Sequence, residues 1–162
     1  MAEHVCFFPT ANGKQIKGDS TQTSLGRQDC IECLSYEQAG ATPFEPSTGQ
    51  ASGRRQYTPL KITKRIDKAS PLLWQAMTQN QKVEGVFKFY RPNPTGDGTT
   101  EQFFSVQIGK GFIASIRQFV EDTLAPTESY EPPMEELTLI FHEIQWTYTN
   151  GGVQHEDKWS ES

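Results

Sequence analysis

The chain has 162 residues, with 15 Lys and Arg against 20 Asp and Glu, which gives a net charge of -5. This charge offers no general attraction for phosphate backbones or anionic lipids, so neither nucleic acid nor membrane is an expected partner. No basic segment followed by an apolar one opens the chain, and no stretch approaches the roughly 18 apolar residues of a membrane span. We therefore expect one domain, 1–162, made and folded in the cytoplasm.

The first third of the chain predicts a hairpin, a strand and a long loop. His4 to Pro9 is typical of a strand, and Ala11-Asn12-Gly13 of the turn that follows it. Asp29 to Glu37 predicts a further strand. Residues 40 to 56 are rich in Gly, Pro and Ser without periodicity, so we predict a long extended loop, called the arm below. Compact domains seldom carry such a loop unless it has a function, so we expect it to touch another molecule.

The middle of the chain predicts a strand and one short helix. Tyr57 to Ile66 alternates apolar with polar residues, as strands do. Ser70 suits the N-cap and Pro71 the first helical position, which places a helix at about 70–80. Its apolar face is expected to consist of Leu72, Leu73, Ala76 and Met77.

The remainder predicts further antiparallel strands. Two alternating segments, Val83 to Tyr90 and Phe103 to Ile108, flank a turn and form a hairpin. Gly109-Lys110-Gly111 is interpreted as a turn before a separate strand, Phe112 to Phe119. An acidic, Pro-rich connection, Glu121 to Glu136, follows.

The segment from Leu137 to Tyr148 predicts one long strand whose apolar face changes between Phe141 and Ile144. Such a change requires a bulge or a strand that passes between two packing environments, as in a barrel. Asn150-Gly151-Gly152 then turns the chain into a last strand, Val153 to Trp159.

The sequence offers no firm catalytic, cofactor or metal site, so we predict no enzyme activity. Cys6, Cys30 and Cys33 are too few for a disulfide framework, and reduced thiols are expected. Cys30 and Cys33 have the spacing of a redox or zinc pair, but in a strand residues three apart point to opposite faces. The three histidines, His4, His142 and His155, lack the short spacing of a metal pair.

Five segments together resemble the haemolysin-coregulated protein (Hcp) family of type VI secretion. The longest runs from Tyr57 to Ala76, YTPLKITKRIDKASPLLWQA. The others are Ile16 to Ser20, Ile31 to Tyr36, Ile144 to Tyr148 and Asp157-Lys158-Trp159. The chain departs from the family pattern at Gln28 to Cys30, where relatives often carry a His.

The resemblance implies a mainly β fold, an antiparallel barrel of two packed sheets with one helix. It also implies rings of six copies that stack into a tube, sheath and spike proteins as partners, and export without a signal peptide. Ser35 and Glu37 would face the pore, where small effector proteins can be held. Because a closed barrel has few free edges, we expect the arm to join neighbouring copies. The contact residues would be Thr42, Phe44, Gln50, Arg54, Arg55 and Tyr57.

Two alternatives remain open at this point. A stand-alone barrel that binds a small ligand would be monomeric. An enzyme built on Cys30, Cys33 and the histidines would lose its activity when both cysteines are replaced by Ser.

Overall fold

The computed structural model describes residues 4–122, 124 and 132–159. In these residues it contains eleven strands, one α-helix and one short 3₁₀ turn, η1. The elements are β1 His4–Ala11, β2 Lys14–Gln15, η1 Ser24–Gly26, β3 Ile31–Glu37, β4 Gly40–Ala41, β5 Gln56–Tyr57, β6 Leu60–Arg65, α1 Ser70–Thr78, β7 Val83–Pro92, β8 Thr100–Phe119, β9 Met134–Ile140, β10 Glu143–Tyr148 and β11 Val153–Lys158. The predicted connection from Glu121 to Glu136 lies partly outside the described residues, and β9 begins within it.

The predicted N-terminal hairpin is confirmed. β1 pairs with β2 across Asn12 and Gly13, whose φ angles are 51° and 80°. Asn and Gly tolerate this left-handed region better than other residues, which explains why they occupy the turn.

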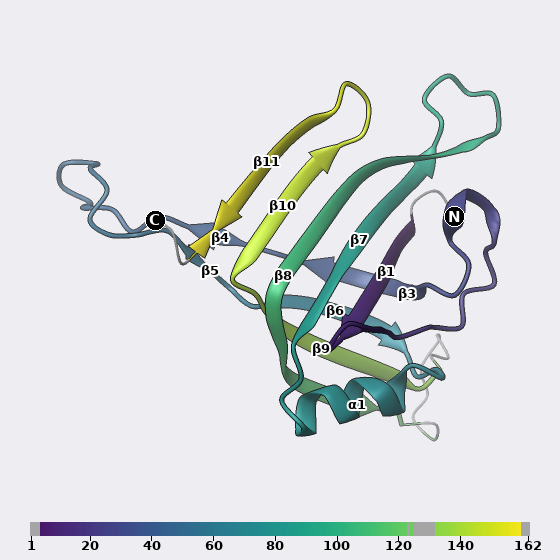
Figure 1. Cartoon of the computed structure of the whole chain (residues 1–162). Coiled ribbons are helices and arrows are strands. Elements are labelled where there is room, and N and C mark those ends of the chain that lie inside the picture. The colour runs from purple at the N-terminus through teal and green to yellow at the C-terminus, as the bar shows by residue number, and fades with distance from the viewer. Residues whose placement is uncertain (1–3, 123, 125–131, 160–162) are drawn as a thin grey trace.

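The main sheet closes into a barrel. Its strands follow the order β11-β10-β8-β7-β1-β3-β6-β9, and β9 also pairs with the second half of β8. β11, β10, β8, β7 and β1 form one wall, and β3, β6 and β9 cross behind it (Figure 1). This arrangement confirms the predicted barrel of two packed antiparallel sheets.

β8 is one continuous strand of 20 residues that belongs to both walls. Its first half pairs with β7 and β10, and its second half with β9. The predicted turn at Gly109-Lys110-Gly111 is therefore wrong: the chain bends there and continues. Gly111 permits the bend, because a Cβ at this position would lie 2.5 Å from the carbonyl oxygen of Ile140.

The predicted long strand from Leu137 to Tyr148 is in fact two strands. β9 ends at Ile140 and β10 begins at Glu143, and the two pair with different halves of β8. The apolar parity changes because the chain turns a corner at Phe141 and His142, passing from one wall to the other.

Apolar side chains fill the centre of the barrel. Phe7 and Phe87 stack with their ring centroids 4.0 Å apart, and both are fully buried. Val106, Leu137 and Ile144 belong to the same buried cluster. The alternation of strand residues thus produces one packed interior.

Helix α1 lies across one end of the barrel (Figure 1). It ends at Thr78, two residues earlier than predicted, and its buried residues are Ser70, Leu73 and Ala76. Leu72 was expected on the apolar face but is 41% exposed. No helical segment among the described residues is long and apolar enough to cross a membrane.

Ser70 was predicted to be the N-cap of the helix, but Ala69 occupies that position. Its hydroxyl instead joins a buried polar network. It donates to Glu135 Oε1 at 3.0 Å and accepts a hydrogen bond from Lys64 Nζ at 3.2 Å. Lys64 Nζ also lies 2.8 Å from Glu135 Oε1, and both side chains are fully buried. The start of the helix is thus held by the hydrogen bonds between Ser70 and two residues of the barrel, Lys64 of β6 and Glu135 of β9, and not by an N-cap side chain.

Burial alone would raise the pKa of Glu135, but hydrogen bonds from Lys64 and Gln118 outweigh it and lower this pKa. The carboxylate therefore stays charged inside the barrel. A buried charge of this kind is tolerated only while its partners remain in place.

The expectation of three reduced thiols is wrong for two of them. Cys6 on β1 and Cys30 before β3 form a disulfide, with Cα atoms 5.6 Å apart. Both are fully buried in a small cluster with Tyr90. Cys33 is free and buried, as expected. The sequence did not predict this disulfide, because the two cysteines are 24 residues apart and become neighbours only when β1 pairs with β3.

Candidate assembly surface

The arm is an irregular two-stranded hairpin that projects away from the barrel (Figure 1). β4 pairs with β5, and Phe44 forms a bridge with Ala51 further out. At the tip, the Glu45 amide donates to the Gln50 carbonyl oxygen at 2.7 Å. Every residue from 41 to 54 is exposed except Pro43, which is half-buried. The predicted loop is therefore ordered along its own length while remaining clear of the body.

A clamp at its base fixes the arm to β11. The Arg55 guanidinium donates from Nε and Nη2 to the two carboxylate oxygens of Asp157, at 2.5 and 2.6 Å. Arg55 Nη2 also donates to the Lys158 carbonyl oxygen at 3.0 Å, and the Tyr57 hydroxyl donates to Asp157. Two parallel hydrogen bonds between a guanidinium and a carboxylate fix the relative orientation of the two side chains.

The clamp also alters the acidity of its members. Hydrogen bonding from Arg55 lowers the pKa of Asp157 below its ordinary value. Burial, together with the hydrogen bond to Asp157, raises the pKa of Tyr57. The carboxylate therefore remains charged, and the phenol remains a donor, over the neutral range.

An apolar hollow lies beside the clamp and is called the base pocket below. The Tyr57 ring contacts those of Phe141 and Trp159, with centroids 5.5 and 5.7 Å apart. The pocket has a volume of about 350 Å³, and most of its surface is apolar. Its walls include Tyr57, Pro59, Leu139, Phe141, His142 and Trp159.

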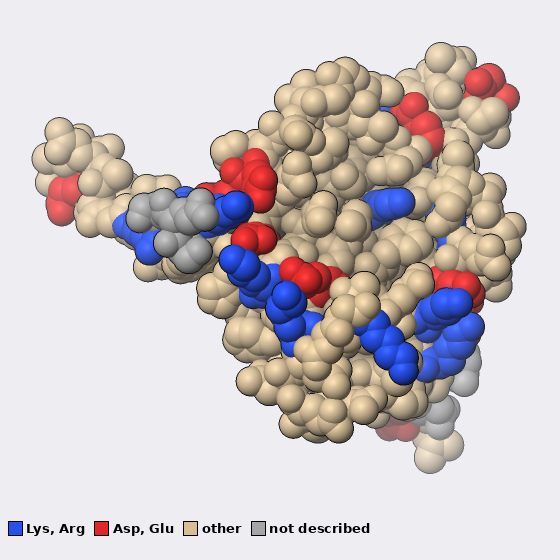
Figure 2. Space-filling view, viewed as in Figure 1, with Lys and Arg blue, Asp and Glu red and all other residues tan. Residues whose placement is uncertain are grey.

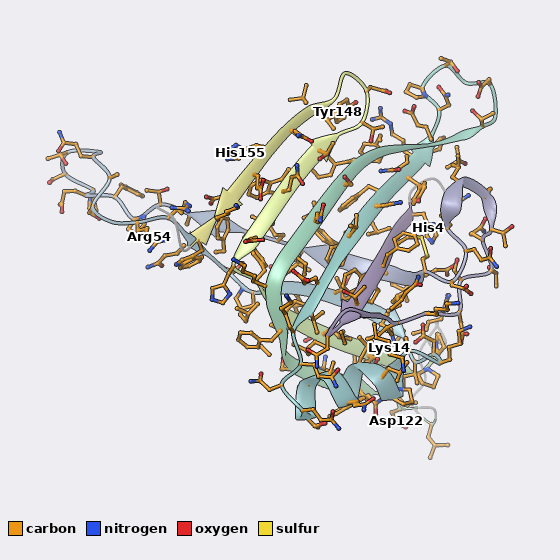
Figure 3. All side chains as sticks on the ribbon, in the orientation of Figure 1. His4, Lys14, Arg54, Asp122, Tyr148 and His155 are labelled. Atoms are coloured by element: carbon orange, nitrogen blue, oxygen red, sulfur yellow. A yellow bond between two sulfur atoms is a disulfide. The ribbon has the colours of Figure 1, made fainter. Side chains whose placement is uncertain are left out.

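The predicted arm contacts fall into two groups. Thr42, Phe44 and Gln50 lie exposed on the projecting part. Arg54 lies where the arm meets the body (Figure 3), with its guanidinium 5.8 Å from the centre of the Trp159 ring. Arg55 and Tyr57 are bonded to Asp157 of their own chain, so they hold the arm in place from within.

The predicted pore residues, Ser35 and Glu37, are both exposed on β3. Leu34 was expected on the opposite side with Tyr36, yet it is 48% exposed. A register irregularity between Cys33 and Ser35 accounts for this, because an extra residue in the strand turns two neighbours to the same face.

Both walls of the barrel carry charged side chains on their outer faces. Beside Ser35 and Glu37, the outer face of the second wall carries the ion pairs Lys61–Glu136 at 3.5 Å and Arg117–Glu136 at 3.4 Å. The outer face of the first wall also carries charged side chains of both signs (Figure 2), among them the pair Lys110–Glu143 at 3.1 Å.

The residues considered for chemistry are dispersed. In the described part of the chain, no three His, Cys, Asp or Glu side chains are grouped so that they could hold a metal ion. Burial raises the pKa of the Cys33 thiol, which leaves it protonated and unreactive. His142 is exposed at the corner, where its Nδ1 lies 2.9 Å from the Lys110 carbonyl oxygen.

The profile of the family described as "Type VI secretion system effector, Hcp" matches residues 8–148. This chain belongs to the Hcp family. It is thus a tube subunit of type VI secretion, and Hcp subunits assemble with copies of themselves.

Individual relatives agree with this assignment. The "Major exported protein" of Pseudomonas aeruginosa is 27% identical over 157 residues, covering 93% of this Hcp chain and 90% of the relative. The Hcp1 protein of E. coli EAEC 042 has 26% identity and a TM-score of 0.79, and the match covers 98% of this chain and 99% of that one. A further Hcp crystal structure has the same fold, with a TM-score of 0.85 at 21% identity over 99% of this chain and all of the other.

Sequence reasoning missed the role of Asp157 in this Hcp chain. The tripeptide Asp157-Lys158-Trp159 contributed to the resemblance, but nothing in it indicated a partner 102 positions earlier. The base pocket was missed for the same reason, since its walls come from β5, the β9–β10 corner and the end of β11.

Proposed function

We propose that this Hcp chain forms closed rings of six copies that stack into the inner tube of the secretion machine. Sheath and spike proteins are its further partners, small effector proteins occupy the pore, and the subunit is itself exported. The relative named "Major exported protein" supports the export. The observation that carries the proposal is the arm, which is exposed along its length and clamped at its base.

The shape of the subunit favours a head-to-tail contact. Six strands close the barrel, and β11 lies outside this closed set as a free edge of the main sheet. A ring requires two different surfaces, one on each side of the subunit, that match after a fixed rotation. The clamped arm can provide one of these surfaces. Because the clamp already holds the arm in place, the arm loses little conformational entropy on binding.

Ser35 and Glu37 are proposed to face the pore. Both are exposed on β3, and a small hydroxyl beside a carboxylate forms a polar wall. Such a wall binds protein cargo weakly, which suits later release.

The whole chain acts as a structural unit without catalysis in this proposal. Cys33 is buried and His142 is exposed, so these two side chains do not form a nucleophile paired with a general base. The stand-alone ligand carrier gains no support from the barrel centre, which the side chains of the core cluster occupy.

The test is the mass of the purified particle. Six chains of 18.3 kDa give a ring of about 110 kDa, measured by light scattering after size exclusion. Negative-stain images should show rings with a hollow centre. A particle that stays at the mass of one chain at high concentration would refute the proposal.

A further inference from the structure

Asparagine or aspartate precedes glycine at three positions of the chain, Asn12-Gly13, Asp97-Gly98 and Asn150-Gly151. Each pair lies in a connection between two strands, and the φ angles of the three glycines are 80°, 83° and 90°. In such a pair, the backbone nitrogen of the glycine can attack the side-chain carbonyl carbon of the residue before it, because glycine has no Cβ to shield its backbone. The three sites differ in whether the structure leaves this attack open.

Hydrogen bonds restrain the side chains of the first two pairs. Asn12 Oδ1 accepts a hydrogen bond from the Lys82 amide at 3.0 Å, and the Asn12 amide donates to the Lys82 carbonyl oxygen at 2.8 Å. Asp97 Oδ1 accepts a hydrogen bond from the Thr99 amide at 2.9 Å. The Thr99 hydroxyl also donates to Asp97 and lowers its pKa, so this side chain stays a carboxylate, which nucleophiles attack far less readily than an amide. At both sites the reaction must first break hydrogen bonds.

The third pair has no such restraint. Asn150 and Gly151 are exposed at the tip of the β10–β11 hairpin (Figure 1). The Gly152 amide closes the turn by donating to the Thr149 carbonyl oxygen at 3.3 Å. Among the described residues, no hydrogen bond holds the Asn150 side chain or occupies the Gly151 amide. No atom of a non-adjacent residue lies within 4 Å of the place that a Cβ of Gly151 would take, so neighbouring groups do not block the approach.

We propose that Asn150 is a site of spontaneous deamidation in the folded protein. The Gly151 nitrogen gives up its proton and forms a bond to Cγ of Asn150. The bond between Cγ and Nδ2 breaks, and the side-chain nitrogen leaves as ammonia with that proton. Water then opens the five-membered succinimide ring at either of its two carbonyl groups, which leaves aspartate or isoaspartate. Water is the sole co-reactant, and the reaction does not depend on the assembly of rings.

The two products change the hairpin tip in different ways. Aspartate adds a negative charge. Isoaspartate routes the backbone through the side-chain carbons, which adds one methylene group to the turn that sets the register of Tyr148 with Val153. β11 is paired on one side only, so it can loosen at this end without opening the closed barrel. The modification therefore acts on the strand that carries Asp157 of the clamp.

The direct experiment follows the mass of each asparagine in the folded full chain. The protein is kept in mildly alkaline buffer, and peptides taken at intervals are mapped by mass spectrometry. We expect Asn150 to convert about five- to ten-fold faster than Asn12, because the reaction at Asn12 must first break the hydrogen bond from Lys82. In urea, where the fold is lost, the two sites should convert at similar rates.

Two variants support the assignment. Asn150→Gln should remove the mass change at this position, because its longer side chain would have to close a larger ring. Asn150→Asp gives the charge and mass of one product and serves as the standard for peptide mapping. After conversion of the parent chain, hydrogen exchange should be faster in residues 153–158 and unchanged in β1 and β7.

Equal rates at Asn150 and Asn12 in the folded chain, or a faster reaction at Asn12, would overturn the proposal. Unchanged hydrogen exchange in β11 after conversion would overturn the effect on this strand. Neither result bears on the proposed ring, whose mass is measured separately.

Discussion

Asp157 receives both prongs of the Arg55 guanidinium, and these two residues join the end of the last strand to the base of the arm. The pair connects positions 102 residues apart. The direction in which the arm projects therefore depends on one carboxylate outside the arm.

Replacing Asp157 with Asn should loosen the arm without unfolding the barrel. The amide cannot accept both prongs of Arg55, so a spin label placed by Gln50→Cys should rotate faster at pH 7. Asp122→Asn serves as the control, because the Asp122 side chain bonds the nearby Leu124 amide, remote from the arm. An unchanged spectrum for Asp157→Asn would contradict the role of the clamp.

Acid should release the same clamp. The pKa of Asp157 is lowered by Arg55, so its contribution is complete above the ordinary value of about 3.9 and is lost as the pH falls through the lowered value. We expect label mobility to stay constant between pH 8 and 5 and to rise at lower pH. The Asn variant should show high mobility at every pH.

The Lys64–Glu135 pair should be costly to break and easy to replace. Lys64→Met leaves Glu135 buried without its cation, and a loss of about 3–5 kcal/mol in unfolding free energy is expected. The double variant with Glu135→Leu removes both charges and should recover most of this loss. Urea denaturation measures both, and a single variant as stable as the parent would refute the account.

The Cys6–Cys30 disulfide should contribute to stability. It closes a loop of 24 residues, for which the chain-entropy estimate is about 3 kcal/mol. Titration of the denatured protein should find one thiol before reduction and three after it. Cys33→Ser is the matched control, since it should lower both counts by one and leave the effect of reduction on melting temperature unchanged.

Removing the arm should separate folding from assembly. Deleting residues 41 to 53 takes away the exposed hairpin but leaves Arg55 and Tyr57 in the clamp. The circular dichroism spectrum of the barrel should persist, while light scattering should report weaker ring or tube formation. A ring of undiminished stability would show that the arm has no part in assembly.

A gold label can locate the pore face. A maleimide-linked gold particle on Ser35→Cys should appear at the centre of the ring in electron micrographs. Labelling at Leu72→Cys on the helix provides the comparison. Gold at the outer rim for Ser35→Cys would overturn the assignment of Ser35 and Glu37.

Much of the fold follows from local patterns in the sequence. Asn12-Gly13 and Gly151-Gly152 adopt left-handed backbone angles that other residues adopt with difficulty, and both pairs mark turns as predicted. The exposed, Gly- and Pro-rich arm was equally visible. Signals of this kind depend on a few neighbouring residues.

What the sequence did not reveal depends on distant partners. Gly109-Lys110-Gly111 has the composition of a reversal, and only the pairing of β8 with both walls identifies it as a bend. Ser70 resembles a cap in its local setting, but the buried Lys64 and Glu135 bond its hydroxyl. The clamp and the base pocket likewise join segments about 100 residues apart.

The uninterrupted course of β8 has a mechanical consequence for the stacked tube that we propose, in which each subunit would carry load. A force applied to the first wall passes to the second wall through the covalent backbone of β8. Its transmission at the bend does not depend on hydrogen bonds between strands. The barrel should accordingly resist shearing between its walls, and its two halves should lose their structure in a single step when it is loaded to failure.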